Sequence, residues 1–169
     1  MPHPIGDGVK PYLPLARLLA LVIPLLLLGG AYVSQYVGGL FPCEMCWWQR
    51  YPHMVAIALA LVAFAARGDG RVSTALTALA ALAIGVSGGI GLFHAGVEYG
   101  WWEGLTACST SPTSGNPADI LSQIMATPIT RCDVAPWSLL GISLAGYNGL
   151  LSLGAAVAIL ALLSKGRKA

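Results

Sequence analysis

Charged residues are scarce in this chain. Asp, Glu, Lys and Arg make up 9% of its 169 residues, whereas hydrophobic residues make up 56%. A water-soluble domain usually carries about 25% charged residues, so the scarcity argues against a soluble globular protein. The few basic residues form no patch interleaved with stacking aromatic residues, which argues against a nucleic-acid-binding surface. Long uncharged runs take the place of the missing charge, and they indicate segments that cross a lipid bilayer.

Four uncharged stretches are candidates for membrane crossing, because a transmembrane helix needs roughly 20 mostly apolar residues. They predict helices at about residues 15–36, 47–66, 72–95 and 137–163, joined on one side by loops at about 37–46 and 96–136. The third stretch is rich in glycine, alanine and serine, small residues that let helices approach closely in lipid. We therefore expect an all-α membrane protein: a four-helix transmembrane bundle forming a single integral membrane domain over residues 1–169.

The basic residues indicate how the bundle is oriented, because lysine and arginine gather on the cytoplasmic flanks of membrane helices. With four crossings, one side receives Lys10, Arg17, Arg67, Arg71, Lys165, Arg167 and Lys168. We therefore expect both termini in the cytoplasm and both long loops on the opposite side, which is the periplasm in a bacterial inner membrane.

All four cysteines lie in the two loops expected outside the cytoplasm. Cys43 and Cys46 are in the first loop, and Cys108 and Cys132 are in the second. Disulfides persist in an oxidising compartment such as the bacterial periplasm. An even number of cysteines confined to that side argues for disulfide chemistry.

The close spacing of Cys43 and Cys46 fits several kinds of site. Haem attachment requires histidine directly after the second cysteine, but Trp47 stands there. A closed zinc site needs four ligands, usually as two close pairs, and Cys108 and Cys132 are not a close pair; we expect no metal. A structural disulfide in so small a ring would restrain little of the unfolded chain. Close pairs are more often redox-active, which is the reading we favour.

Two further side chains are candidates for the same site. If the second helix begins near Cys46, Arg50 lies one turn later on the same face, where a cation and a helix N-terminus would both stabilise a thiolate. Alternatively, Arg50 reaches the lipid headgroups. His94, near the outer end of the third stretch, is the second candidate; alternatively, it simply pairs with Glu98.

The second pair of cysteines suggests a route for electrons. A disulfide between Cys108 and Cys132 could be approached by a soluble protein, and thiol–disulfide exchange could then carry electrons inward; the alternative is a stapled loop without turnover. Electrons that reach Cys43 and Cys46 need an acceptor. Because no metal or haem motif is visible, a lipid-soluble quinone is inferred by elimination, and His94 could hydrogen-bond or protonate one of its oxygens.

The second loop also contains a helix signal. Asn116 fits an N-cap and Pro117 fits the first helical position. The apolar residues that follow fall on one face: Ile120, Leu121, Ile124 and Met125. We expect a short amphipathic helix that lies flat on the membrane surface.

These features together resemble the bacterial disulfide bond formation protein B (DsbB) family. The resemblance rests on four spans, on the Cys-x-x-Cys followed by Gln49 and Arg50, and on a second cysteine pair in a long outer loop. The matching strings are Cys43 to His53, His94 to Glu98, Arg131 to Asp133, and Pro136 to Ser138. The combination is specific, whereas Cys-x-x-Cys alone would not be.

The resemblance implies a protein-dithiol:quinone oxidoreductase of the inner membrane that reoxidises a periplasmic thioredoxin-fold oxidase, DsbA-like, and so supports disulfide bond formation. It implies that the partner attacks Cys108 and that Cys132, its loop mate, exchanges with Cys43. It implies that Cys46 is the thiolate that faces the quinone, ubiquinone or menaquinone, and forms a charge-transfer adduct. Arg50 and His94 are then expected beside the quinone.

Two other readings stay open at this point. A thiol/quinone oxidoreductase similar to vitamin K epoxide reductase shares the four-helix and Cys-x-x-Cys logic, but its active pair usually comes late in the chain, whereas Cys43 and Cys46 come early. A membrane scaffold with two structural disulfides would catalyse nothing.

Overall fold

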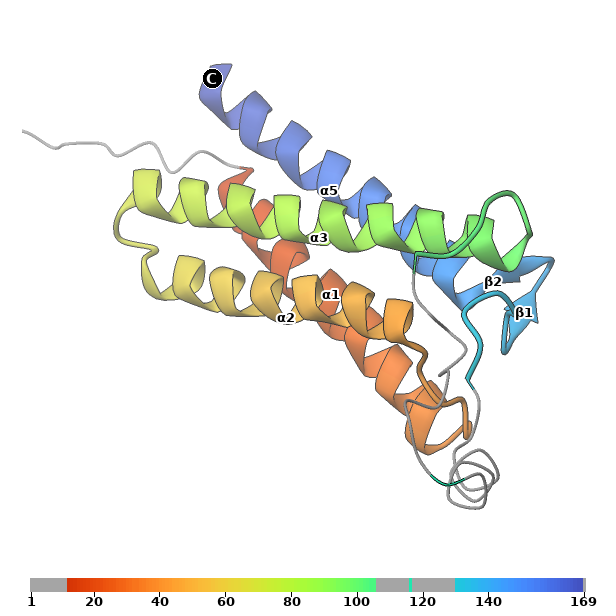
Figure 1. The fold of residues 1–169 in the computed structure, drawn as a ribbon. Helices are drawn as coiled ribbons and strands as arrows, with labels where there is room; N and C mark the ends of the chain where they lie inside the picture. Colours follow the sequence, from red (N-terminus) through yellow and green to blue (C-terminus); the bar gives the residue numbers. More distant parts are fainter. Residues whose placement is uncertain (1–11, 106–115, 117–129, 169) are drawn as a thin grey trace, which may run out of the picture.

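Four long helices form the bundle in the computed structural model of the protein, which describes residues 12–105, 116 and 130–168. Their bounds are α1 Leu13–Tyr36, α2 Glu44–Ala65, α3 Gly70–Glu98 and α5 Leu144–Lys168. Helices α2 and α3 run antiparallel side by side, and α5 packs along α3 (Figure 1). The predicted surface helix after Pro117, and Cys108, lie outside the described residues.

Three of the four helices, α1, α3 and α5, are long and apolar enough to cross a membrane. Large apolar side chains cover their outer faces, such as Leu26 and Val157, each 67% exposed. Helix α2 differs because its first half carries Gln49, Arg50 and His53, all of which are buried. By length and composition, the structure supports three of the four predicted crossings.

The predicted start of the fourth helix at residue 137 is wrong. A short hairpin precedes the helix: β1 (Ser138–Leu139) pairs antiparallel with β2 (Ile142–Ser143). Its two turn residues have positive φ, 52° at Leu140 and 78° at Gly141, and a turn of that kind matches the twist of a two-stranded hairpin. Helix α5 therefore begins at Leu144 and runs beyond the predicted end, to Lys168. Apart from this hairpin, the elements of the described residues are helices, as the all-α expectation predicted.

The first three helices lie close to their predicted ranges but differ at the ends. Helix α1 begins at Leu13, two residues before the prediction, and α3 extends over Gly70–Glu98 rather than 72–95. The side chain of Asp69 caps α3, accepting hydrogen bonds from the backbone N–H groups of Arg71 (2.9 Å) and Val72 (3.1 Å). A tight turn between Ala65 and Gly70 therefore joins α2 to α3, at the end of the bundle opposite the hairpin (Figure 1).

Glycines bring the backbones of α3 and α5 close together, as the small residues of the third stretch predicted. A Cβ atom at Gly91 would lie 2.9 Å from both the carbonyl oxygen of Ala145 and the amide nitrogen of Gly149. A Cβ atom at Gly149 would lie 2.9 Å from the amide nitrogen of Leu92. These contacts are with backbone atoms, which cannot move aside as a side chain can, so both positions require glycine.

We expect Gly91→Ala to lower the Tm of the detergent-solubilised protein, because overpacking at a tight contact costs about 1–3 kcal/mol. Gly89→Ala is the matched control, since a Cβ at Gly89 meets nothing within 4 Å. The control should be neutral or stabilising, because alanine favours a helix over glycine by about 1 kcal/mol. Equal Tm values for the two variants would contradict the close packing of α3 and α5.

Candidate redox site

Cys43 forms the N-cap of α2, with φ −77° and ψ 177°, and its sulfur accepts a hydrogen bond from the backbone N–H of Cys46 at 3.3 Å. The helix therefore begins at Glu44, earlier than the predicted residue 47. This places Cys46 in the first turn, where the positive end of the helix dipole favours negative charge. Both cysteines are free thiols, with their sulfur atoms 3.0 Å apart.

The two sulfurs have different roles in this hydrogen bond. The thiol of Cys43 donates to the sulfur of Cys46. That hydrogen bond, followed by burial of the side chain and a further contact with Cys132, holds the pKa of Cys43 far above its ordinary value. Cys43 therefore keeps its proton, and Cys46 is the sulfur positioned to carry negative charge. Since the thiolate is the reactive form, Cys46 is the better nucleophile of the pair.

His94 reaches the sulfur pair from α3. Its ring is 1% exposed, with Nδ1 2.8 Å from Nε2 of Gln49 and Nε2 3.6 Å from the sulfur of Cys43. The pairing with Glu98 considered above is loose, since Nε2 lies 3.8 Å from Oε1 of that carboxyl group. His94 also interacts with the backbone of Cys132. The imidazole thus contacts residues from both cysteine-bearing loops.

Cys132 lies beside the first cysteine pair. It is 1% exposed and shares a buried cluster with Cys43, Met45 and Val97. One cysteine of the second loop is therefore within the site built at the start of α2. Of the four predicted cysteines, the structure brings Cys43, Cys46 and Cys132 together, and Cys108 lies outside the described residues.

Arg50 is buried rather than extended towards the lipid headgroups, since only 6% of it is exposed. Its guanidinium group donates to Oε1 of Gln35 (2.6 Å) and to the backbone oxygen of Ala31 (3.2 Å), both on α1. The same group stacks over the rings of Tyr32 and Trp47, 4.9 Å from each centroid. These contacts hold a permanent positive charge between α1 and α2.

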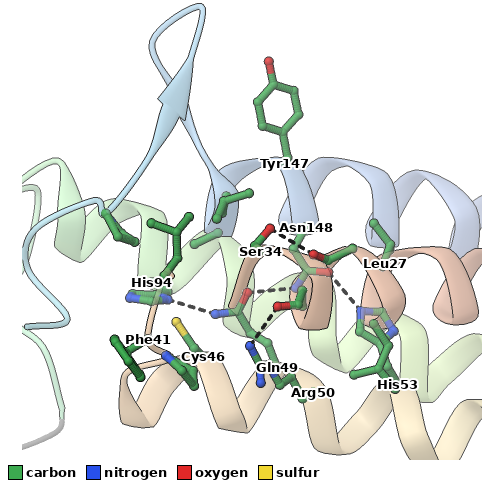
Figure 2. Close-up of a pocket in the computed structure, with 18 of the residues that line it drawn as sticks. Leu27, Ser34, Phe41, Cys46, Gln49, Arg50, His53, His94, Tyr147 and Asn148 are labelled. Carbon is green, nitrogen blue, oxygen red and sulfur yellow. Dashed lines mark hydrogen bonds between the residues drawn. The ribbon is translucent and has the colours of Figure 1, made fainter. Parts of the chain in front are cut away.

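A cavity of about 250 Å³ lies between α1, α2, α3 and α5. Its apolar wall comes largely from α1, through residues such as Leu27 and Ala31, and its polar side includes Cys46, Arg50 and His94. The structure thus places three predicted site residues on one cavity, where Figure 2 shows them with their neighbours.

A hydrogen-bonded row of polar side chains was not predicted as part of the site. Oε1 of Gln49 accepts from Nδ2 of Asn148 (2.8 Å), and Oδ1 of Asn148 lies 2.9 Å from Nε2 of His53. The row continues from Gln49 to His94, as the dashed lines in Figure 2 show. A polar residue inside a membrane segment is a functional candidate by default, and Asn148 within the last uncharged run was such a signal.

Ligand atoms of Cys43, Cys46 and His94 all lie within 4.8 Å of one another, and all three side chains are of types that bind zinc. No metal site was expected from the sequence, because the four cysteines do not form two close pairs and His94 was not counted as a ligand. Whether this group can bind a metal depends on which ring nitrogen of His94 carries hydrogen, because a metal needs a nitrogen with a free lone pair.

The chain is similar to known proteins of one family over most of its length. Residues 14–162 match the sequence model of the family described as "Disulfide bond formation protein DsbB". The chain is 31% identical over 160 residues to disulfide bond formation protein B of Verminephrobacter eiseniae, covering 88% of this chain and 84% of that protein. It is 30% identical over 135 residues to the protein of the same name in Marinobacter nauticus (73% and 76%). An uncharacterized protein of Rickettsia prowazekii is 27% identical over 140 residues (81% and 80%). No solved structure matches the chain.

In the reduced protein, we expect an alkylating reagent at neutral pH to modify Cys46 before Cys43. The raised pKa of Cys43 keeps it in the unreactive thiol form, and its alkylation should become fast only at a pH well above the ordinary thiol range. Peptide mass spectrometry resolves the two sites. Cys46→Ala is the control for burial, because it removes the hydrogen-bond acceptor and should speed alkylation at Cys43. Faster modification of Cys43 in the unchanged protein would contradict this assignment.

Proposed function

Because this chain belongs to the disulfide bond formation protein DsbB family, and is therefore a membrane oxidoreductase of disulfide bond formation, we propose that it is a quinone-dependent thiol oxidase. In this proposal it reoxidises a periplasmic thioredoxin-fold, DsbA-like oxidase and passes the electrons to the membrane quinone pool. The observation that carries the proposal is the placement of Cys43, Cys46 and Cys132 together, with Cys46 on the wall of an apolar cavity.

The cavity fits the head of a quinone, which is a flat, apolar ring with two polar oxygens. The apolar wall from α1 suits the ring, and Arg50 offers N–H donors for an oxygen. Two further buried polar atoms on the lining residues have no hydrogen-bond partner among the described residues: Nδ1 of His53 and Oε2 of Glu98. Such atoms suit a ligand with polar groups. When bound, a quinone supplies an acceptor for two electrons and two protons.

The protein's own residues carry the sulfur chemistry. In the proposed sequence, the partner's dithiol reduces a disulfide between Cys108 and Cys132, and the thiolate of Cys132 attacks the sulfur of Cys43 in a Cys43–Cys46 disulfide. The Cys43–Cys132 bond forms as the Cys43–Cys46 bond breaks, and the electron pair stays on Cys46. The helix N-terminus stabilises that thiolate. Two electrons and two protons thus leave the partner dithiol for each disulfide that it gains.

The proposed orientation places both termini in the cytoplasm and the cysteine-bearing loops in the periplasm. The sulfur site, the hairpin and the α1–α2 connection share one end of the bundle, whereas Arg67 and Arg71 lie by the turn at the other end. This distribution supports the orientation, because basic residues favour the cytoplasmic side.

The activity test offers the purified protein a reduced thioredoxin-fold donor and a soluble quinone, and follows quinone absorbance. We expect Arg50→Met to lower kcat/KM for quinone about 10- to 100-fold, since a hydrogen bond to a charged group contributes about 1.5–3 kcal/mol. Arg67→Met, an exposed arginine at the far end of the bundle, is the control and should behave as the unchanged protein. Absence of donor-dependent quinone reduction in the unchanged protein would refute the proposal.

A trapping experiment tests the proposed entry point for electrons. Offered the donor in its disulfide form, Cys132→Ser should accumulate a mixed disulfide between Cys108 and the donor: the Cys108 thiolate breaks the donor's disulfide, one donor sulfur leaves as a thiolate, and no Cys132 sulfur remains to displace the donor from Cys108. Non-reducing electrophoresis followed by mass spectrometry identifies the adduct. The double variant with Cys108→Ser and Cys132→Ser should form none. A Cys132→Ser protein that turns over normally and forms no adduct would exclude this route. A membrane scaffold with purely structural disulfides would also form no adduct.

A further inference from the structure

Backbone carbonyl groups fix the orientation of two side-chain amides near the sulfur site. A carbonyl oxygen can only accept hydrogen bonds. The backbone oxygen of Met45 lies 3.2 Å from one terminal atom of Gln49, which must therefore be the donor Nε2. In the same way, the backbone oxygen of Ser87 lies 3.3 Å from Nδ2 of Asn148. The remaining contact agrees with both assignments, since Nδ2 of Asn148 donates to Oε1 of Gln49 at 2.8 Å.

The orientation of Gln49 decides which nitrogen of His94 carries hydrogen. Nε2 of Gln49 donates to Nδ1 of His94 at 2.8 Å, so Nδ1 presents its lone pair. A neutral imidazole has one hydrogen on its two nitrogens, and here that hydrogen must be on Nε2. This nitrogen lies 3.6 Å from the sulfur of Cys43 and 3.8 Å from Oε1 of Glu98, so the Cys43 sulfur is the nearer of these two acceptors. His94 therefore donates towards the sulfur pair.

The donors then form one chain with a single direction. Gln49 donates to His94, His94 donates to Cys43, and Cys43 donates to Cys46. Each step presents the positive end of a dipole to the next group, and hydrogen bonds arranged in this way polarise one another. The chain therefore stabilises negative charge at its end, on Cys46.

The direction of this hydrogen-bond chain opposes metal binding by Cys43, Cys46 and His94, whose ligand atoms lie within 4.8 Å of one another. A metal would need the lone pair of Nε2, the nitrogen that faces the sulfurs. A metal-binding histidine almost always donates its other N–H to an acceptor. Gln49 presents a donor at that position, which is the opposite arrangement.

We propose that Gln49, held by Met45 and Asn148, is a positioning residue that keeps the His94 hydrogen on Nε2, facing Cys43, and so keeps a latent thiol–imidazole site for soft divalent metal ions closed. The two thiols then stay available for exchange. This role concerns the same site as the proposed function, but its tests use neither quinone nor a protein partner, so each can fail without the other.

Nitrogen NMR of the reduced protein with isotope-labelled histidine tests the first half of the proposal directly. The signal that disappears in His94→Ala belongs to His94. We expect its Nε2 to show the chemical shift of a protonated ring nitrogen and its Nδ1 that of a nitrogen with a lone pair. The opposite assignment would overturn the proposal, and the measurement requires no change to Gln49.

Cobalt(II) added to the reduced protein tests the second half, because thiolate coordination gives it visible absorption. We expect Gln49→Glu to bind cobalt(II) roughly 10- to 100-fold more tightly than the unchanged protein, since the new carboxylate accepts from Nδ1 and frees Nε2, and outer partners of metal ligands have effects of that size. Gln49→Met, which removes the donor without adding an acceptor, should gain less. His94→Ala in the Gln49→Glu protein should abolish the gain.

Equal cobalt(II) affinity in the unchanged protein and in a folded Gln49→Glu protein would refute the latent metal site, and so would a gain that survives His94→Ala. Thermal unfolding in detergent establishes that each variant is folded. If Gln49→Glu does not fold, the tautomer of His94 in the unchanged protein still decides the proposal.

Discussion

A polar side chain buried in a lipid-embedded bundle must find its hydrogen-bond partners within the protein, because neither lipid tails nor apolar side chains offer any. Gln49 meets this requirement through the backbone of Met45, the ring of His94 and the amide of Asn148. Each partner comes from a different part of the fold: α2 itself, α3 and α5. The arrangement of these three helices is therefore tied to a single amide group.

The close contact between α3 and α5 is what allows Asn148 to reach this amide. A Cβ atom on Gly91 would lie 3.1 Å from Nδ2 of Asn148, as well as against the backbone of α5. On the same side of α3, Ser87 donates to the backbone oxygen of Gln49 at 2.8 Å and lies 2.9 Å from Nε2 of His53. The small residues of α3 therefore serve both the packing of the bundle and the polar row beside the cavity.

Local patterns in the sequence were sufficient to identify Cys43, Cys46 and Arg50, because all three lie within two turns at the start of one helix. The bond between Gln49 and Asn148 could not be predicted in this way, since the two residues are 99 positions apart and meet because α2 and α5 both pack against α3. The hairpin before α5 was missed because its residues are as apolar as the helix that follows. Cys43 was expected in a loop, and its role as helix cap depends on backbone geometry that spacing does not reveal.

The anchoring of Arg50 on α1 makes this charge sensitive to the lipid around the protein. Both of its acceptors, Gln35 and the backbone of Ala31, belong to α1, whereas Cys46 and Arg50 belong to α2. A membrane helix adjusts its tilt when its apolar length and the thickness of the bilayer differ. A change in the tilt of α1 would move the acceptors relative to the guanidinium group and alter the cavity wall beside it. The length of the lipid acyl chains therefore acts on this centre through the tilt of α1, and not through contact with a sulfur atom.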